Sequence, residues 1–206
     1  DYCKHRKLDI LKKPVHIVPI WDNQKRGYIE TVWPGISEVR TTAFRTKSYA
    51  GMDKPVFGSK VKKLFKGRKK NGDQWENQEA EVEFPEFCEI TIWRLVQGQR
   101  VQFPGPRVEW MEIYQRAGAF NDVPNDRWKK APVQMLEKCA EAAALRRAFP
   151  EEFGDEWTAE ESGAIERHHN AVDITSEAAA TTAPAEPKRG DFTGDPPADP
   201  KADPKA

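Results

Sequence analysis

The chain has 206 residues, of which 38% are hydrophobic and 32% are charged, and its formal net charge at pH 7 is zero. This length suits one domain with an appendage, and the low hydrophobic content indicates that part of the chain lies outside a packed core. The cysteines Cys3, Cys88 and Cys139 form no CxxC or His/Cys cluster, which argues against a disulfide framework and against a zinc site.

The zero net charge conceals an asymmetry along the chain. Residues 1–75 hold 18 Lys and Arg against 7 Asp and Glu, whereas residues 76–170 hold 11 against 19. A basic first part suits an anionic partner, and it equally suits head-to-tail association between copies of the chain. The sequence shows neither a signal peptide nor a run of 18 apolar residues, so neither secretion nor a membrane span is expected.

The N-terminal part predicts a helix end followed by a hairpin. Residues 2–8 are polar and basic, and we expect them to end a helix. The β-branched alternation of residues 15–21 predicts a strand, and residues 28–33 predict its returning partner after a turn over 22–27. Because the chain begins at Asp1, inside what this pattern marks as structure, we expect a further N-terminal segment in the natural protein.

Pro34 and Gly35 end the hairpin, and a helix is predicted to follow them. The apolar residues that recur at helical spacing are Ile36, Val39, Ala43 and Phe44. On such a helix Arg40 and Arg45 fall near the exposed flanks. Residues 49–58 predict a further extended segment.

Residues 60–70, KVKKLFKGRKK, hold seven Lys and Arg in eleven positions, and Gly67 and Asn71-Gly72 are turn formers. Three interpretations stay open. The segment is a solvated, mobile loop, a nuclear localisation patch, or a basic finger that neutralises phosphates. For the basic finger, an aromatic side chain such as Trp75 is available to stack on bases.

The middle of the chain predicts a small antiparallel sheet. An acidic stretch over 76–89 compensates the basic segment, and residues 89–96 predict a central strand. Residues 99–103 predict its return after a turn at Gly98, and residues 108–114 predict a further strand or an irregular edge. With helices before and after it, this pattern places the fold in the α+β class, a small antiparallel sheet with flanking helices.

Residues 128–154 carry the strongest helix signal, after a polar linker over 115–127. Pro132 suits a first helical turn, good helix formers follow it, and Pro150 and Gly154 end the helix. At about 100° per residue one apolar sector emerges, and the opposite side carries glutamates. The apolar sector holds Met135, Leu136, Cys139, Ala140 and Ala143, and the glutamates are Glu137 and Glu141.

Arg146 falls back into the apolar sector at the helix C-terminus. Either its stem is buried while its head reaches water, or its guanidinium lines a groove that accepts phosphate. Residues 157–166 predict a short acidic helix, and residues 167–206 are rich in Pro and Ala, with a single aromatic residue. We therefore expect a folded core over 1–166 and a disordered tail over 167–206.

Motifs of covalent chemistry are missing from the sequence. It contains no GxxxxGK[ST], no GxSxG and no HExxH, so common ATP hydrolysis, serine hydrolysis and zinc proteolysis are not indicated. The carboxylates over 151–161 suggest one alternative, a Mg²⁺-dependent nuclease. A non-enzymatic interaction scaffold whose basic segment binds an acidic protein is the other.

An ordered set of residues resembles a known family. The set comprises Trp128, Pro132, Met135, Leu136, Lys138, Ala140, Arg146, Ala148, Phe149, Pro150, Gly154, Glu160 and Glu161. Residues 8–21 and 33–53 are similar to the first strand and the following helix of the same family. Over roughly residues 2–165 the chain thus resembles the phage recombination proteins of the Bet/RecT type, the single-strand annealing proteins related to lambda Red beta.

The resemblance implies ATP-independent binding of single-stranded DNA and annealing of complementary strands in phage-type homologous recombination, without catalytic residues. It implies no cofactor, and a requirement for Mg²⁺ stays open. The implied partners are single-stranded DNA, the annealed duplex intermediate, further copies of the chain in a ring or helical filament, a phage exonuclease and a host single-strand binding protein. The implied location is the bacterial host cytoplasm, with no membrane partner.

We assign the predicted DNA contacts to basic side chains and one aromatic residue. They are Arg40, Arg45, Lys62, Lys63, Lys66, Arg68, Lys69, Lys70, Trp128, Lys129, Lys130, Lys138 and Arg146. For Trp128 two interpretations stay open, because an indole at a helix entrance either packs into the core or stacks on a base.

Overall fold

The computed structural model describes residues 1–22, 25–72, 74–118, 121–154 and 156–161. In chain order its elements are α1 (Tyr2–His5), the 3-10 turn η1 (Ile10–Lys12), β1 (Val15–Asp22), β2 (Gly27–Pro34), α2 (Ile36–Arg45), β3 (Tyr49–Met52), β4 (Val56–Phe57), β5 (Lys60–Asn71), β6 (Gln74–Pro85), β7 (Phe87–Glu89), β8 (Thr91–Val96), β9 (Gln99–Pro104), β10 (Val108–Glu109), α3 (Trp110–Ile113), β11 (Arg116–Gly118), β12 (Asn121–Pro124), α4 (Asp126–Lys130), α5 (Pro132–Ala148), α6 (Pro150–Phe153) and the 3-10 turn η2 (Ala159–Glu161).

The described strands form small antiparallel sheets, so the predicted α+β class is confirmed. Their orders are β1-β2, β10-β7-β4, β11-β12-β5-β6 and β3-β8-β9. The predicted hairpins of β1 with β2 and of β8 with β9 are both present, and β8 is the central strand of its sheet. Gln97 and Gly98 make the turn between β8 and β9 with positive φ angles of 51° and 80°, which suits a tight hairpin turn.

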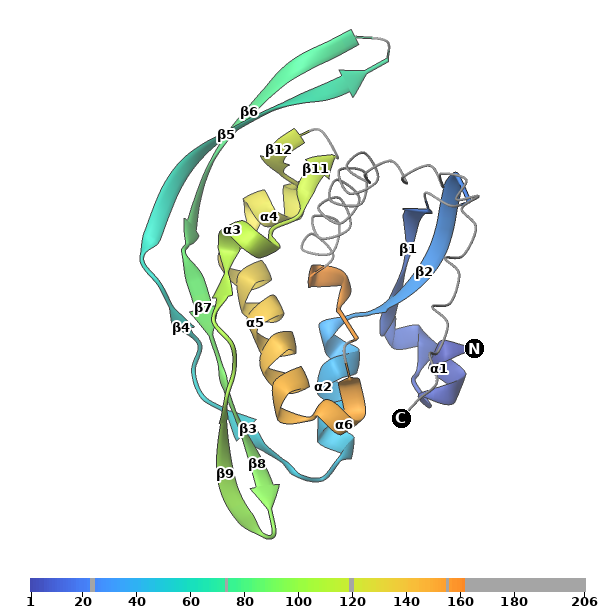
Figure 1. Ribbon diagram of the computed structural model, residues 1–206, viewed down its shortest axis with the longest axis vertical. Helices are drawn as coiled ribbons and strands as arrows, with labels where there is room; N and C mark the ends of the chain where they lie inside the picture. Colours follow the sequence, from blue (N-terminus) through green and yellow to red (C-terminus); the bar gives the residue numbers. More distant parts are fainter. Residues whose placement is uncertain (23–24, 73, 119–120, 155, 162–206) are drawn as a thin grey trace, which may run out of the picture. The chain divides into compact units, whose positions relative to one another are not determined.

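The basic segment 60–70 is a strand, so the loop interpretation is wrong. β5 pairs with β6 along its whole length, from Lys60 opposite Pro85 to Asn71 opposite Gln74. Figure 1 shows this hairpin curving along one side of the described chain, with α3 beside it and β7 at its base. Lysines and glutamates are poor strand formers on their own, but opposite charges facing each other across a strand pair stabilise it.

Gly67 lies inside β5 rather than in a turn. A Cβ atom at this position would lie 1.9 Å from Oδ1 of Asn121, so glycine permits the close approach of β12 to β5. Asn121 pairs with Gly67 in the sheet, and its side chain donates to Gln78 Oε1 at 2.8 Å. The described residues of the segment 115–127 include β11, β12 and the start of α4, so the prediction of a polar linker is wrong.

Two further segments differ from their predictions. Residues 108–114 form a strand only at Val108–Glu109 and then turn into α3, because Trp110 and Ile113 are buried one helical turn apart. The acidic helix predicted over 157–166 is limited to η2 within the described residues. The predicted disordered tail, 167–206, lies outside the described residues.

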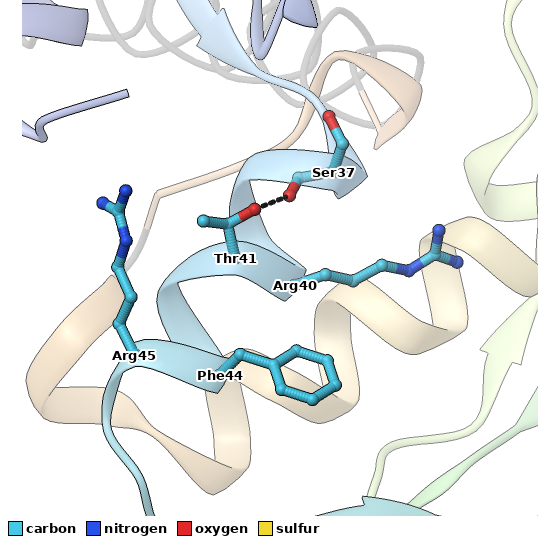
Figure 2. Close-up of a pocket in the computed structure, with 5 residues that line it drawn as sticks. All are labelled: Ser37, Arg40, Thr41, Phe44 and Arg45. Atoms are coloured by element: carbon cyan, nitrogen blue, oxygen red, sulfur yellow. Dashed lines mark hydrogen bonds between the residues drawn. The ribbon is translucent and has the colours of Figure 1, made fainter. Parts of the chain in front are cut away.

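α2 lies against α5 through Ile36, Val39 and Ala43, which are 6%, 3% and 1% exposed. Gly35 is its N-cap residue, and the chain enters the helix directly from β2. The side of α2 that remains at the surface is lined by Ser37, Arg40, Thr41, Phe44 and Arg45, which surround a depression (Figure 2). We call these five residues the α2 face.

α5 is the central element of the fold, packed between α2 and the strands β6, β7, β8 and β10 (Figure 1). The prediction of one apolar sector is wrong in one respect, because α5 is buried on several sides. Ala142 and Ala144 are at most 1% exposed, and Glu141 is only 3% exposed. Alanines allow neighbouring elements to approach the helix on more than one side, which a one-sided pattern does not predict.

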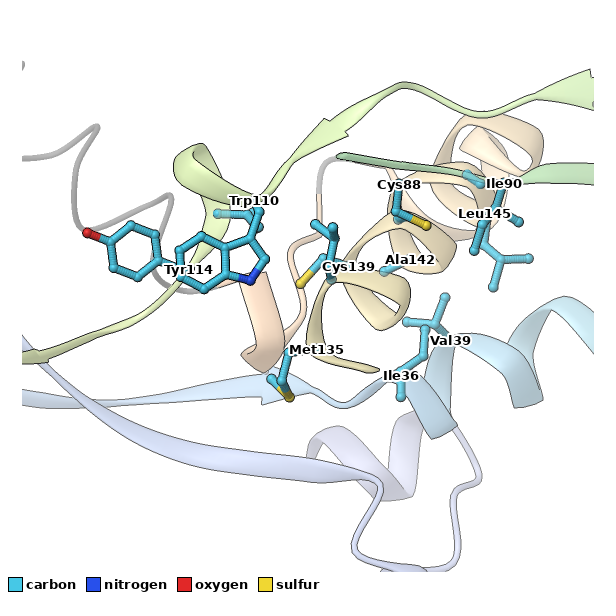
Figure 3. Packing of buried hydrophobic residues seen from close by; sticks show 14 of the residues in the cluster. Ile36, Val39, Cys88, Ile90, Trp110, Tyr114, Met135, Cys139, Ala142 and Leu145 are labelled. Atoms are coloured by element: carbon cyan, nitrogen blue, oxygen red, sulfur yellow. The ribbon is translucent and has the colours of Figure 1, made fainter. Parts of the chain in front are cut away.

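Aromatic rings close the core at the α3 end of α5 (Figure 3). Trp110 stacks on Phe84 with ring centroids 3.8 Å apart and on Tyr114 at 4.6 Å. Trp128 meets Trp110 edge-on at 5.7 Å and is fully buried. Of the two interpretations of Trp128, the structure supports packing at the helix entrance.

Candidate nucleic-acid interface

The α2 face follows from the helical period. At about 100° per residue, its five members fall within one arc of about 140°, and the buried residues of α2 fill the remaining arc. Those buried residues are Ile36, Glu38, Val39, Thr42 and Ala43. The helix therefore presents two arginines, an aromatic ring and two hydroxyl groups on a single side.

Arg40 is fixed in direction by a carboxylate of α5. Its Nε donates to Oε1 of Glu141 at 2.7 Å and its Nη2 donates to Oε2 at 2.5 Å. The Arg40 side chain is 47% exposed, whereas that of Glu141 is 3% exposed. The hydrogen bonds from Arg40 to Glu141 raise the pKa of the arginine above its usual value. This contact uses Nε and Nη2 and does not involve Nη1.

Arg45 is held from the other side, by backbone carbonyl groups. Its Nη1 donates to the carbonyl oxygen of Arg6 at 2.7 Å, and its Nη2 donates to that of Lys7 at 2.8 Å. Figure 2 shows the Arg40 and Arg45 side chains extending in opposite directions from α2, with Phe44 between their points of origin. The two guanidinium groups thus border the depression on different sides.

Phe44 is the residue of this surface that sequence reasoning missed. The pattern assigned it to the apolar side with Ile36 and Val39, but its side chain is 66% exposed. Its ring lies against Tyr49 with centroids 4.7 Å apart, tilted by 57°. The angular position of Phe44 on the helix does indicate its exposure. Phe44 lies about 40° from Arg40, on the side away from Val39.

The basic residues of β5 that point outward lie beside a row of glutamates. Lys60 Nζ lies 3.5 Å from Glu83, Lys62 Nζ lies 2.7 Å from Glu81, and Lys66 Nζ lies 3.3 Å from Glu79. All six side chains are more than half exposed. Exposed pairs of this kind stabilise a fold by only about 0–1 kcal/mol and can exchange partners.

The remaining predicted contacts of β5 lie in different settings. Lys63 points to the inner face, where its Nζ lies 5.4 Å from the centroid of the Phe65 ring. Arg68 and Lys69 are exposed. The side chain of Lys70 lies outside the described residues.

The predicted contacts on α4 and α5 divide into paired and open cations. Lys129 pairs with Asp126 at 2.7 Å, whereas Lys130 is exposed and Lys138 is partly exposed. Arg146 donates from Nη1 and Nη2 to the two oxygens of Glu161 at 2.6 and 2.5 Å. That pair is 15% and 2% exposed, so the charge of Arg146 is neutralised inside the protein.

Three of the described carboxylates of the 151–161 segment, those of Glu151, Glu156 and Glu161, make structural contacts. Glu151 pairs with Arg94 at 2.6 Å and Glu156 pairs with Arg6 at 2.7 Å. Glu161 also accepts from the backbone N and the hydroxyl group of Thr158. Among the described residues, no group of three or more His, Cys, Asp or Glu side chains is placed to hold a metal ion.

The comparisons with known proteins identify a family. Residues 1–173 match the RecT family. No curated protein and no solved structure matches the chain. No helix in the described part of the chain has the length and apolar character to cross a membrane. With most of its length matched, the chain belongs to the RecT family, a family of phage-type recombination proteins that anneal single strands.

Proposed function

We propose that this protein binds single-stranded DNA and anneals complementary strands without ATP in phage-type homologous recombination. The observation that carries the proposal is the α2 face, where Arg40 and Arg45 border a depression that also contains the exposed ring of Phe44. Cations beside an accessible aromatic ring are the two elements of a sequence-tolerant site for single strands.

The geometry suits annealing because the side chains of the α2 face can contact the DNA backbone and leave the base edges accessible. Guanidinium groups bind phosphate oxygens through several N–H donors, and such contacts position a strand without reading its sequence. An aromatic ring stacks on the face of any base. A strand held in this way keeps its pairing edges free for a complementary strand.

Other predicted contacts extend the proposed site. Lys62, Lys66 and Arg68 on the hairpin, with Lys130 and Lys138 near α5, are exposed or partly exposed cations that can add phosphate contacts. Trp128 and Arg146 are not part of the proposed site, because the first is buried and the second is neutralised by Glu161.

The proposal includes an assembled state and a cellular setting. Several copies in a ring or helical filament would hold many nucleotides in register by multiplying weak contacts. The partners proposed with it are a phage exonuclease and a host single-strand binding protein in the bacterial cytoplasm. The nuclease alternative finds little support, because Glu151, Glu156 and Glu161 form ion pairs with Arg94, Arg6 and Arg146, and the described residues hold no group of three or more potential metal ligands.

The test of the function is the annealing of two complementary fluorescent oligonucleotides without ATP, at salt concentrations from about 50 to 200 mM. We expect the protein to accelerate duplex formation, and the acceleration to fall as salt rises. Strand lengths are checked on a denaturing gel in the presence of Mg²⁺, because a nuclease shortens them. A folded protein that gives no acceleration would contradict the proposal.

The test of the site is Phe44→Ala, with Tyr28→Ala on β2 as the matched control. Both rings are more than half exposed. Loss of one stacked base corresponds to about 1–3 kcal/mol, so we expect Phe44→Ala to weaken binding of an oligonucleotide roughly 5- to 150-fold. The control should weaken it much less. Equal effects of the two substitutions would remove the α2 face from the proposal.

A further inference from the structure

We infer that Glu156 is a positioning residue for DNA binding, which acts by fixing the backbone carbonyl groups that hold the guanidinium of Arg45. The inference rests on the proposed function, because it concerns a side chain of the α2 face. Glu156 itself lies beyond α6 and belongs to neither α2 nor the hairpin.

Two hydrogen bonds join Glu156 to the N-terminal helix α1. Its Oε1 accepts from the hydroxyl group of Tyr2 at 2.8 Å, and its Oε2 accepts from Nη2 of Arg6 at 2.7 Å. Arg6 also donates from Nη1 to the carbonyl oxygen of Glu152 at 3.3 Å. One carboxylate thus binds both ends of α1 to the segment around α6.

α1 depends on these contacts to keep its place. The described part of α1 buries none of its residues, so polar contacts such as those of Tyr2 and Arg6 with Glu156 hold it against the rest of the fold. After it, Lys7 adopts a left-handed conformation with φ of 51°. The carbonyl groups of residues 6 and 7 lie at the end of the helix, where intrahelical donors are missing.

The carbonyl groups of Arg6 and Lys7 in turn hold a side chain of the α2 face. They accept the two hydrogen bonds of Arg45, at 2.7 and 2.8 Å. Arg40 is held directly by one carboxylate, but Arg45 is held by backbone atoms whose place depends on Tyr2, Arg6 and Glu156. Without Glu156, α1 loses its anchor, and Arg45 must be ordered by the DNA at the expense of affinity.

The experiment is a double-mutant cycle of Glu156→Gln and Arg45→Ala, with binding of a labelled single-stranded oligonucleotide measured across a salt series. Glu152→Gln is the matched control, because Glu152 is exposed and its backbone oxygen, not its carboxylate, binds Arg6. Removing a negative charge alone favours DNA binding. We expect the opposite for Glu156→Gln, a loss of about two- to tenfold, and no loss for Glu152→Gln.

The cycle separates positioning from general destabilisation. If Glu156 acts through Arg45, Glu156→Gln has no further effect in the Arg45→Ala background, and both single variants lower the salt slope by up to about one. Tyr2→Phe provides a second variant that removes one hydrogen bond and no charge, and it should give a smaller loss that also vanishes without Arg45.

Two outcomes overturn the inference. If the Glu156→Gln variant binds the oligonucleotide as tightly as the Glu152→Gln variant, the carboxylate of Glu156 does not support the site. A loss that persists in the Arg45→Ala background shows that Glu156 acts by another route. A folded wild-type chain that binds no single-stranded DNA is a different result, because it overturns the proposed function and the inference with it.

Discussion

Arg40 and Glu141 join the two helices on which the candidate interface rests, through a two-point contact between a half-exposed guanidinium and a buried carboxylate. The donor atoms Nε and Nη2 lie 2.7 and 2.5 Å from the two carboxylate oxygens. The residues are 101 positions apart in the sequence. This pair therefore fixes a side chain of the α2 face and also satisfies a charge inside the fold.

The first prediction concerns the stability that this pair provides. Arg40→Ala leaves the carboxylate of Glu141, 3% exposed, without its partner. We expect the free energy of unfolding to fall by about 1–3 kcal/mol, the cost of an unsatisfied buried acceptor. The measurement is urea denaturation, with the exposed Arg147→Ala on α5 as the control. An effect no larger than that of Arg147→Ala would show that Glu141 finds other partners.

Arg146 provides the second prediction. Its contact with Glu161 is shielded from water, and removing one member of a buried pair costs about 3–5 kcal/mol. We expect Arg146→Ala to destabilise the protein by an amount near that range, while the folded variant keeps its affinity for single-stranded DNA. Adding Glu161→Gln should recover part of the stability. A variant that loses DNA affinity but not stability would return Arg146 to the proposed site.

The elements predicted from the sequence are those whose signal is local. The strands around Ile17 and Val32 alternate, Pro34 and Gly35 mark the start of α2, and Gln97-Gly98 marks a hairpin turn. Each signal lies within a few residues of the element that it describes. The hairpin of β5 and β6 has no such signal, because its stabilising contacts, such as Lys62 with Glu81, form only after the two strands meet.

In the candidate site, too, local features are predicted from the sequence and long-range contacts are not. Helical spacing places Arg40 and Arg45 at the flanks of α2, where the structure has them. Spacing does not reveal their partners, because the carbonyl groups that bind Arg45 are 38 and 39 residues away. Helical spacing groups Phe44 with the apolar residues Ile36, Val39 and Ala43, because apolar residues at this spacing usually share the buried side of a helix. Only the packing of α2 against α5 decides which apolar residues remain at the surface.

The glutamates of β6 lead to the third prediction. Glu79, Glu81 and Glu83 neutralise three lysines of β5 at the protein surface. If the hairpin contacts phosphates, replacing all three glutamates with Gln makes these lysines available to the DNA. We then expect tighter binding of single-stranded DNA. The dependence of affinity on salt should also become steeper, by the release of up to about three more counterions. The measurement is fluorescence anisotropy in a salt series. An unchanged slope would place the hairpin away from the DNA.

The fourth prediction concerns Glu38, a buried acid on the inner side of α2. Its Oε1 accepts from Thr42 Oγ1 at 2.9 Å, and its Oε2 is buried without a hydrogen-bond partner among the described residues. Burial raises the pKa of Glu38 above its usual value, although Thr42, Arg6 and Arg45 act in the opposite direction and Glu156 adds to the increase. The folded chain therefore keeps this proton at a pH where the unfolded chain has released it.

The sign of the pH dependence follows from that difference. Above the usual pKa of glutamate the folded state binds more protons than the unfolded state at this site, so its contribution to stability falls as pH rises through the folded pKa. Glu38→Gln removes this contribution, and its stability relative to wild type should increase across the same pH range. Thr42→Val removes the hydrogen-bond donor that favours the charged carboxylate of Glu38. In this variant the free energy of unfolding should therefore keep falling to a higher pH than in the wild type. The measurement is urea denaturation at a series of pH values, and a constant difference between Glu38→Gln and wild type would show that Glu38 titrates alike in the folded and unfolded chains.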